Sequence, residues 1–302
     1  MRDLRRTTDV GRTRRPRRAS GTHLERHPRV VGRPFDVAPH VTRRPLAVVT
    51  GATSGIGLEF ATEYARRGHD LVLVARSQVD LARTSKDLGD RFGVECTPCV
   101  ADLSSIDGVG AFIDSVLSAG TPDVLVLNAG VTLAARVGVS SPEVIRDVMT
   151  LLALGPMLTI ERIAPLMVAA GKGDIIVVSS IASQIPMPRS AVYAAAKASI
   201  TSYARSVHRE LRDDGVRVVV INPGYVRTNL HRAAGLDHLA RVVPSWLWLE
   251  PNAVVRSAMR ALARGRDSVT PGFVYRVSRP FLASDAAQNL WRRLVRRGRS
   301  TR

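Results

Sequence analysis

The sequence contains little cysteine, little lysine and few aromatic residues, and it has no long uncharged apolar run. Its 302 residues include two cysteines, Cys96 and Cys99, too few for a disulfide scaffold and typical of a reducing compartment. The most apolar stretch, 151–170, is interrupted by Glu161 and Arg162, so no membrane span is expected there. The first residues lack the apolar core of a secretory signal. These features predict a cytoplasmic protein.

Basic residues are abundant but unevenly distributed. The formal net charge is +18, and only three of the 44 basic residues are lysines. Residues 1–45 hold 13 Arg and 4 acidic residues, and residues 276–302 hold 8 Arg and one acidic residue. The whole-chain charge would suggest nucleic acid or an anionic membrane, but residues 46–275 carry only +2. Nucleic acid is therefore not an expected partner. Binding to nucleic acid through the Arg-rich ends is kept only as a hypothesis that ranks below the two functions given at the end of this section.

Composition divides the chain into three parts. Residues 1–44 are rich in arginine and proline and have no periodicity, which predicts a disordered basic extension. Residues 45–275 are the expected folded and catalytic domain. Residues 276–302 have the pattern of a basic amphipathic helix. This tail is a candidate for peripheral contact with the inner membrane face, and an oligomer contact or a solvated end explains it equally well.

Short apolar runs alternate with amphipathic stretches through the body of the chain. The periodicity predicts strands at 46–49, 71–74, 94–100, 124–127, 174–178 and 216–221, and helices at 56–67, 81–92, 109–117, 144–169 and 191–211. Nearly continuous apolar strands separated by helices indicate a parallel sheet that is covered on both faces. The predicted fold class is α/β, a single doubly wound Rossmann fold with helices on both faces of the sheet.

A glycine-rich turn, TGATSGIG, occupies residues 50–57 between the first predicted strand and the first helix. Glycines let the backbone approach a pyrophosphate closely, and the helix N-terminus offers free N–H groups. The strand before it and the helix after it favour a dinucleotide site over an ordinary turn. No acid follows the second strand. Arg76 stands there instead, which favours the 2′-phosphate of NADP(H), although a solvated strand-end arginine is the alternative.

A candidate catalytic group lies further along the chain. Tyr193 and Lys197 are four residues apart on a predicted helix, so they share one face. A lysine cation beside a tyrosine favours phenolate and is expected to lower its pKa toward neutrality. Ser180 follows a strand and can donate a hydrogen bond to a carbonyl or alkoxide oxygen. A YxxxK pair alone is common on surface helices, but its occurrence together with the glycine turn is not.

These motifs resemble the short-chain dehydrogenase/reductase family, in particular its bacterial NADP-dependent ketoreductases. The resemblance covers about residues 45–230 and also rests on Asp102–Leu103, Asn128–Gly130 and the segment 222–228. It implies that Asp102 and Leu103 flank the adenine and that Val226 and Thr228 hold the nicotinamide carboxamide. It also implies that Tyr193 is the acid/base, that Lys197 binds the nicotinamide ribose and that Ser180 orients the substrate.

With Arg76 added for its charge, the expected cofactor-binding residues are Gly51, Thr53, Ser54, Gly55, Ile56, Gly57, Arg76, Asp102, Leu103, Asn128, Ala129, Gly130, Tyr193, Lys197, Pro223, Gly224, Val226 and Thr228, and the expected catalytic residues are Ser180, Tyr193 and Lys197. No metal is expected, because the seven histidines have no ligand-like spacing and the two cysteines face opposite ways on a predicted strand.

One position departs from the family pattern. The family's fourth catalytic residue is an asparagine that holds a relay water, and the corresponding residue here is Leu152, thirteen positions before Pro165. A leucine side chain cannot hydrogen-bond a water. Three alternatives follow: another polar group serves the relay, turnover is slow, or the protein binds cofactor with little chemistry.

The predicted function is NADP(H)-dependent hydride transfer between nicotinamide and a carbonyl or secondary alcohol. The apolar and aromatic stretch 230–249, a substrate lid in the family, suggests a lipophilic substrate, although a plain core helix explains it about as well. The alternative, because of Leu152, is a catalytically weak NADP-binding sensor or scaffold. A homo-oligomer is expected by analogy with the family.

Overall fold

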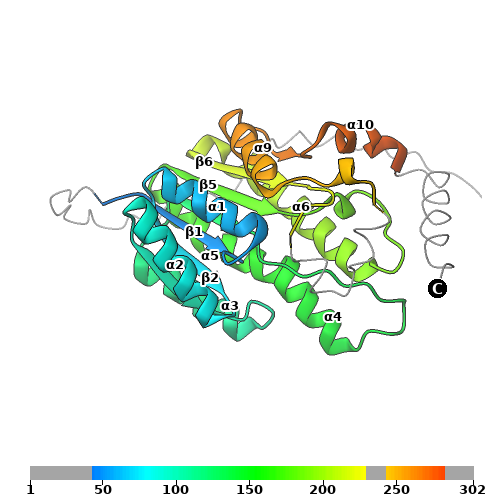
Figure 1. Ribbon diagram of the computed structural model, residues 1–302, viewed down its shortest axis with the longest axis horizontal. Coiled ribbons are helices and arrows are strands. Elements are labelled where there is room, and N and C mark those ends of the chain that lie inside the picture. The colour runs from blue at the N-terminus through cyan, green and yellow to red at the C-terminus, as the bar shows by residue number, and fades with distance from the viewer. Residues whose placement is uncertain (1–42, 229–242, 283–302) are drawn as a thin grey trace, which may run out of the picture. The chain divides into compact units, whose positions relative to one another are not determined.

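The computed structural model describes residues 43–228 and 243–282 (Figure 1). One sheet of seven parallel strands has the order β3-β2-β1-β4-β5-β6-β7. The strands are β1 (Leu46–Thr50), β2 (Asp70–Ala75), β3 (Cys96–Val100), β4 (Val124–Leu127), β5 (Gly173–Val178), β6 (Val216–Ile221) and β7 (Ser268–Val269). The first strand, β1, lies inside the sheet, and later strands are added outward from it on both sides. The predicted doubly wound fold is therefore confirmed.

Two layers of helices enclose this sheet. The longer helices are α1 (Gly55–Arg66), α2 (Gln78–Phe92), α3 (Ile106–Ala119), α4 (Pro142–Met149), α5 (Gly155–Ala169), α6 (Ala191–Leu211), α9 (Pro251–Ala263) and α10 (Phe273–Leu282). The short ones are η1 (Thr150–Leu154), η2 (Ile181–Ser183), η3 (Arg212–Asp214) and η4 (Ser245–Leu247). The core on one face contains residues of α1, α2 and α9, and the core on the other contains residues of α3, α5 and α6.

Alternation along the strands divides the apolar side chains between two cores. In β1, Ala47 and Val49 belong to the core beneath α1 and α9, whereas Val48 belongs to the opposite core. Successive strand residues point to opposite faces, so a strand that is covered on both sides must be apolar throughout. This requirement explains why the strand sequences read as continuous apolar runs.

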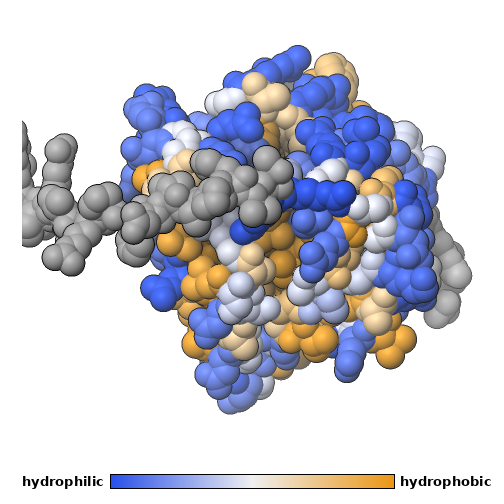
Figure 2. Space-filling view, turned by 90° about the vertical axis from the view of Figure 1, so that its left-hand side faces the viewer, coloured by the Kyte–Doolittle hydropathy of each residue, from blue (hydrophilic) through white to orange (hydrophobic). Residues whose placement is uncertain are grey.

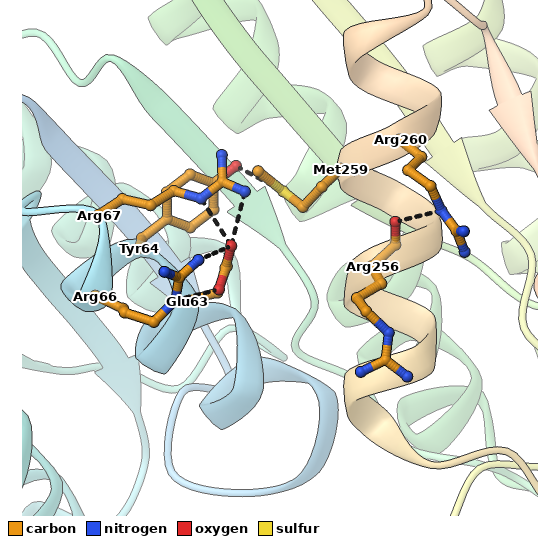
Figure 3. A network of polar contacts seen from close by, with 7 residues as sticks. All are labelled: Glu63, Tyr64, Arg66, Arg67, Arg256, Met259 and Arg260. Carbon is orange, nitrogen blue, oxygen red and sulfur yellow. Dashed lines mark hydrogen bonds and ion pairs between the residues drawn. The ribbon is translucent and has the colours of Figure 1, made fainter.

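Polar contacts supplement the apolar packing between α1 and α9 (Figure 3). The Glu63 carboxylate accepts hydrogen bonds from Arg66 and Arg67, and this pairing lowers the pKa of Glu63 despite partial burial. The Tyr64 hydroxyl lies 3.5 Å from the sulfur of Met259 on α9. Arg67 is thus part of a helix-end ion pair, away from the carboxyl edge of the sheet.

The edge strand β3 holds both cysteines. Cys99 packs into the core with α3, and the half-buried Cys96 packs against the core with α1 and α2. Their predicted placement on opposite faces is confirmed. Both are free thiols, and burial raises the pKa of Cys96 to about 11. A buried, protonated thiol is a poor nucleophile and a poor metal ligand.

The long helical stretch Pro142–Ala169 contains a local irregularity. Within the described residues it is the one helix long and apolar enough to cross a membrane by composition. Leu152, Ile160 and Ile163, however, are buried in the core of this fold, and we interpret the stretch as a core helix. Its middle part, η1, is a π-helical turn rather than the continuous α-helix that the sequence pattern predicted.

The charged ends fall largely outside the described residues. The basic extension and most of the tail lie there, as does 229–242 of the predicted lid. Helix α10 starts at Phe273 and extends across position 276, where we placed the start of the tail. Figure 2 shows the side of the molecule where the chain enters β1. Hydrophilic residues cover much of it, with hydrophobic patches between them.

Candidate active site

The glycine turn has the backbone geometry that a close-approach site needs. Gly51 and Gly55 adopt φ values of +67° and +56°, a region that side-chain-bearing residues rarely occupy. A Cβ on Gly57 would lie 2.1 Å from the carbonyl oxygen of Gly51. The turn therefore excludes side chains at these positions and presents backbone. Ser54, the residue before α1, makes no side-chain capping bond to the first N–H groups of the helix.

Asn128 and Thr50 connect the glycine turn to the end of β4. The Asn128 amide donates to the carbonyl of Thr50 at 2.9 Å. The hydroxyl of Thr50 accepts the backbone N–H groups of Asn128 and Ala129 and donates to the carbonyl of Val126. Asn128 thus acts here by holding the turn in place, a local role that the motif alone did not specify.

Arg76 and Asp102 end neighbouring strands at the same edge of the sheet. Arg76 is exposed immediately after β2, and Asp102 follows β3. Two hydrogen bonds from Ser104 and the positive charge of Arg76 lower the pKa of Asp102. This region therefore carries one exposed guanidinium and a carboxylate held in its charged form.

Ser180 and Tyr193 interact at the carboxyl end of β5. Ser180 lies directly before η2, and its oxygen accepts the backbone N–H of Ala182 at 3.2 Å. Because that contact uses a lone pair, the hydroxyl proton remains free to be donated, and the Ser180 hydroxyl acts to lower the pKa of the Tyr193 phenol. Helix α6 supplies Tyr193 and, one turn later, Lys197.

Lys197 is buried and its ammonium is held by the backbone. Only 6% of the residue is exposed, and Nζ donates to the carbonyl of Val178 at 2.8 Å. The hydroxyl of Ser179 donates to the carbonyl of Lys197 and lies 2.7 Å from that of Thr201. These contacts join the end of β5 to α6 and fix where the ammonium sits.

The pKa of Tyr193 does not follow the expectation from sequence. We predicted that Lys197 would lower it, but burial raises the pKa of Tyr193, and the hydrogen bond from Ser180 opposes that rise only in part. The Lys197 ammonium is directed at the carbonyl of Val178. Burial also lowers the pKa of Lys197 to about 8. Desolvation is therefore the largest influence on the pKa values of both groups.

Leu152 lies where the family pattern has asparagine, within the π-helical turn. It is 1% exposed, and its Cδ2 lies 3.2 Å from the position a Cβ on Gly130 would take. The same Cβ position lies 3.9 Å from Nζ of Lys197. In a regular helix the carbonyl of Leu152 would accept the N–H of residue 156, but Pro156 has none. The Gly155–Pro156 dipeptide was the available sequence signal for this irregularity.

The loop after β6 completes the edge of the sheet. The backbone N–H of Ile181 donates to the carbonyl of Pro223, and a Cβ on Gly55 would lie 2.8 Å from Cγ2 of Thr228. An open cavity of about 430 Å³ separates the start of α1 from this loop. Its lining consists of Gly55, Leu58, Glu59, Arg227, Thr228, Glu250, Pro251 and Asn252.

Tyr275 was not anticipated from the sequence. Its hydroxyl accepts the backbone N–H of Tyr225 at 3.0 Å and donates to the carbonyl of Leu247 at 2.7 Å. Its ring lies where a Cβ on Gly224 would be, only 2.1 Å from that position. Helix α10 is therefore attached to the loop that carries Val226 and Thr228.

The predicted site residues thus all lie along the carboxyl edge of the sheet. They follow β1 (Gly51, Thr53, Ser54, Gly55, Ile56 and Gly57), β2 (Arg76), β3 (Asp102 and Leu103), β4 (Asn128, Ala129 and Gly130), β5 (Ser180) and β6 (Pro223, Gly224, Val226 and Thr228), or lie on α6 (Tyr193 and Lys197). Within 43–228 and 243–282, no group of three or more His, Cys, Asp or Glu residues could hold a metal.

The short-chain dehydrogenase family model matches residues 45–238. The chain belongs to the short-chain dehydrogenase family. It is 32% identical over 194 residues to dehydrogenase/reductase SDR family member 7B of Rattus norvegicus, covering 62% of this chain and 60% of that protein. It is also 32% identical over 231 residues to very-long-chain 3-oxoacyl-CoA reductase of Bos taurus, covering 75% of this chain and 70% of the relative.

A solved structure of another protein has the same fold as this chain. The short-chain dehydrogenase from Sphingobium yanoikuyae in complex with NADPH superposes with a TM-score of 0.72 at 29% identity. The match covers 82% of this chain and 94% of that structure. The predicted family and the single α/β fold are therefore confirmed. The chain spans less than two thirds of the length of the rat relative.

We expect the burial of Lys197 to make stability depend on pH. The lysine binds its proton more tightly in the unfolded chain than in the folded protein. The destabilisation caused by burying its charge is therefore full below about pH 8, and it fades as the pH approaches the pKa of an unfolded lysine, about 10.4. Between pH 7 and 10, the free energy of unfolding of the wild type should gain about 2 kcal/mol relative to Lys197→Met. Urea titrations at both pH values measure this. Lys172→Met at an exposed site is the control, and a constant difference for Lys197→Met would contradict the account.

Proposed function

We propose that this short-chain dehydrogenase transfers hydride between NADP(H) and the carbonyl or secondary alcohol of a lipophilic small molecule. The observation that carries the proposal is the placement of Ser180, Tyr193 and the buried Lys197 at the same sheet edge as the glycine turn. The proton donor and the cation on α6 thus lie at the same sheet edge as the nucleotide cradle, and hydride transfer to a carbonyl uses all three.

The residues present fit NADP(H). Gly51 and Gly57 leave a backbone cradle that a Cβ would fill, and this suits a pyrophosphate. The exposed Arg76 offers a planar fork to a 2′-phosphate, and no acid precedes it at the end of β2. When bound, the cofactor supplies the hydride. The NADPH in the Sphingobium structure supports this assignment.

The protein's own part is to orient the carbonyl and move one proton. Ser180 donates a hydrogen bond to the substrate oxygen, and Tyr193 gives its phenolic proton to that oxygen as negative charge develops there. Lys197 stabilises the phenolate that remains, because its ammonium is one turn away on the same helix. Val178 fixes the orientation of that ammonium.

The Tyr193 phenol can act as the proton donor at neutral pH. Burial raises the pKa of Tyr193, so the phenol is protonated there. A protonated phenol can donate to an alkoxide, and the reverse reaction, alcohol oxidation, returns the proton to the phenolate.

Leu152 decides between an enzyme and a catalytically weak binding protein. Its side chain offers no hydrogen bond, which favours the sensor or scaffold alternative. Pro156, however, deprives the carbonyl of Leu152 of its regular helical donor, and Leu152 packs beside Gly130 near Lys197. We propose that this backbone carbonyl holds the relay water, so that activity does not require asparagine.

The name of the bovine relative and the aromatic residues of the 243–249 segment support a lipophilic substrate. Trp248 packs against Tyr225 in the loop after β6. Homo-oligomer formation is also proposed, because Leu154 at the end of η1 and Leu158 and Leu166 on α5 are exposed at four- and eight-residue spacing. A cytoplasmic location, with contact to the inner membrane face through the C-terminal tail, remains our proposal.

Carbonyl-dependent oxidation of NADPH tests the function. With a panel of ketones and aldehydes of increasing chain length, we expect turnover that rises with apolar length. Tyr193→Phe should lower kcat by at least about 100-fold because the proton donor is lost. The loss of absorbance at 340 nm measures the rate. Saturable NADPH binding without turnover on any carbonyl would support the sensor alternative instead.

The choice of cofactor tests the role of Arg76. We expect Arg76→Asp to weaken NADPH binding by about 1.5–3 kcal/mol, as for loss of a charge-assisted bond, and to leave NADH binding nearly unchanged. Fluorescence titration of both cofactors gives the dissociation constants. Arg83→Asp, an exposed change on α2, is the matched control. Equal wild-type affinities for NADPH and NADH would refute the assignment.

The relay proposal predicts opposite outcomes for two neighbouring changes. Leu152→Asn should alter kcat by less than about threefold, because the backbone carbonyl of Leu152 already holds the relay water. Pro156→Ala should lower kcat by roughly tenfold, since the new N–H competes for the Leu152 carbonyl. Steady-state kinetics with a soluble ketone measures both. A large gain in rate for Leu152→Asn would show that the relay is incomplete in the natural sequence.

A further inference from the structure

Two segments that are distant in sequence are joined beside the glycine turn. The backbone N–H of Arg227 donates to the carbonyl of Leu249 at 2.9 Å, and the N–H of Leu249 donates to the carbonyl of Tyr225 at 2.8 Å. Val226 pairs with Leu249 in a parallel bridge, and its side chain is buried in the core beneath α1 and α9. The loop after β6 is therefore tied to the segment before α9 as far as Arg227, and Thr228 follows next.

The side chain of Arg227 adds two contacts to the same junction. Its Nε lies 3.0 Å from Oε1 of Glu250, and its guanidinium carbon lies 6.0 Å from the centre of the Trp248 ring. An ion pair and a cation–π contact thus act on one side chain. The Arg227 and Glu250 side chains are 51% and 59% exposed, so we expect each contact alone to be weak.

Both partners of Arg227 are fixed by other parts of the chain. Nε1 of Trp248 donates to the carbonyl of Val243, and the Trp248 ring packs against Tyr225. The carbonyl of Glu250 accepts N–H groups from the first turn of α9, while its side chain makes no capping bond to this helix. The carboxylate is thereby left for Arg227, at a helix N-terminus where a negative charge is favourable.

This junction forms one wall of the cavity between α1 and the loop after β6. Arg227, Thr228 and Glu250 line the cavity of about 430 Å³ from one side, and Gly55 at the start of α1 lines it from the other. Thr228 lies so close to the glycine turn that a Cβ on Gly55 would be 2.8 Å from its Cγ2. A displacement of the loop would therefore change the space beside the glycine turn.

We infer that Arg227 is a positioning residue for the nicotinamide half of the cofactor. By joining Glu250 and Trp248, it holds Val226 and Thr228 at a fixed distance from the glycine turn. Those two residues are the ones that we expect to bind the nicotinamide carboxamide. The inference rests on the proposed function for the identity of the cofactor. The alternative is that the guanidinium leaves Glu250 and binds the cofactor pyrophosphate directly.

Equilibrium binding of two ligands tests the inference without turnover. Isothermal titration calorimetry would compare NADPH with adenosine 2′,5′-bisphosphate, which has the adenine half and the 2′-phosphate but no nicotinamide. We expect Arg227→Gln and Glu250→Gln each to raise the dissociation constant for NADPH by about fivefold, and to leave that for the bisphosphate within about twofold. The double variant should bind NADPH about as weakly as either single one, because both changes break the same pair.

An exchange of the two charges separates positioning from direct contact. Arg227→Glu alone should weaken NADPH binding by at least about tenfold, because two carboxylates then face each other. Arg227→Glu/Glu250→Arg restores a pair of opposite polarity, so affinity should return to within about threefold of the wild type. Direct binding of the pyrophosphate predicts instead that Glu250→Gln strengthens NADPH binding and that the exchanged pair is not rescued. Either of these results would overturn the inference.

Arg205→Gln is the matched control. Arg205 on α6 pairs with Asp267 at 2.8 Å, just before β7 and at the opposite edge of the sheet, so its loss should leave both dissociation constants within about twofold. Equal losses for both ligands in Arg227→Gln would mean general distortion and would contradict positioning. Wild-type protein that binds no NADPH would refute the proposed function together with this inference. Tight wild-type binding that the variants leave unchanged would refute the inference alone.

Discussion

The burial of one ammonium group, that of Lys197, constrains the site more than any other feature. A charge removed from water must be compensated, and here the carbonyl of Val178 at the end of β5 accepts its hydrogen bond. The neighbouring Ser179 bonds the backbone of Lys197 and contacts Thr201, so strand and helix cannot shift independently. This placement determines where Tyr193, one turn earlier, meets Ser180. Burial of this ammonium lowers the pKa of Lys197 to about 8.

The parallel sheet turns this local constraint into a site. Because the strands all end at one edge, the glycine turn after β1, Arg76 after β2, Asn128 after β4 and Ser180 after β5 face a common region. Asn128 connects the first and third of these segments through Thr50. The arrangement needs no side chain in the turn itself, where a Cβ on Gly57 would collide with the backbone.

Sequence predicted the features that depend on local pattern. The apolar runs predicted the ends of the central strands to within two residues. The turn at 50–57 was predicted from its glycines, because few other residues adopt positive φ angles. The features that sequence missed depend on distant contacts. The pKa of Tyr193 rises because burial outweighs charge, and burial is a property of the assembled core. The two bonds of Tyr275 likewise join segments that no short motif connects. The π-helical turn at Thr150–Leu154 was missed for another reason, because its local signal, Gly155–Pro156, was not used. The partner of Lys197 is a backbone carbonyl, which leaves no signature in side-chain identity.

The account's central claim is that this edge transfers hydride from NADPH to a carbonyl carbon. Isotope transfer tests it most directly. The protein would be incubated with a carbonyl substrate and NADPH that carries deuterium at both C4 positions, and the alcohol product analysed by mass spectrometry. We predict a product one mass unit heavier, with deuterium on the carbinol carbon and none when Tyr193 is changed to Phe. An unlabelled alcohol, or NADPH bound at the site with no product from any carbonyl in the panel, would contradict the claim.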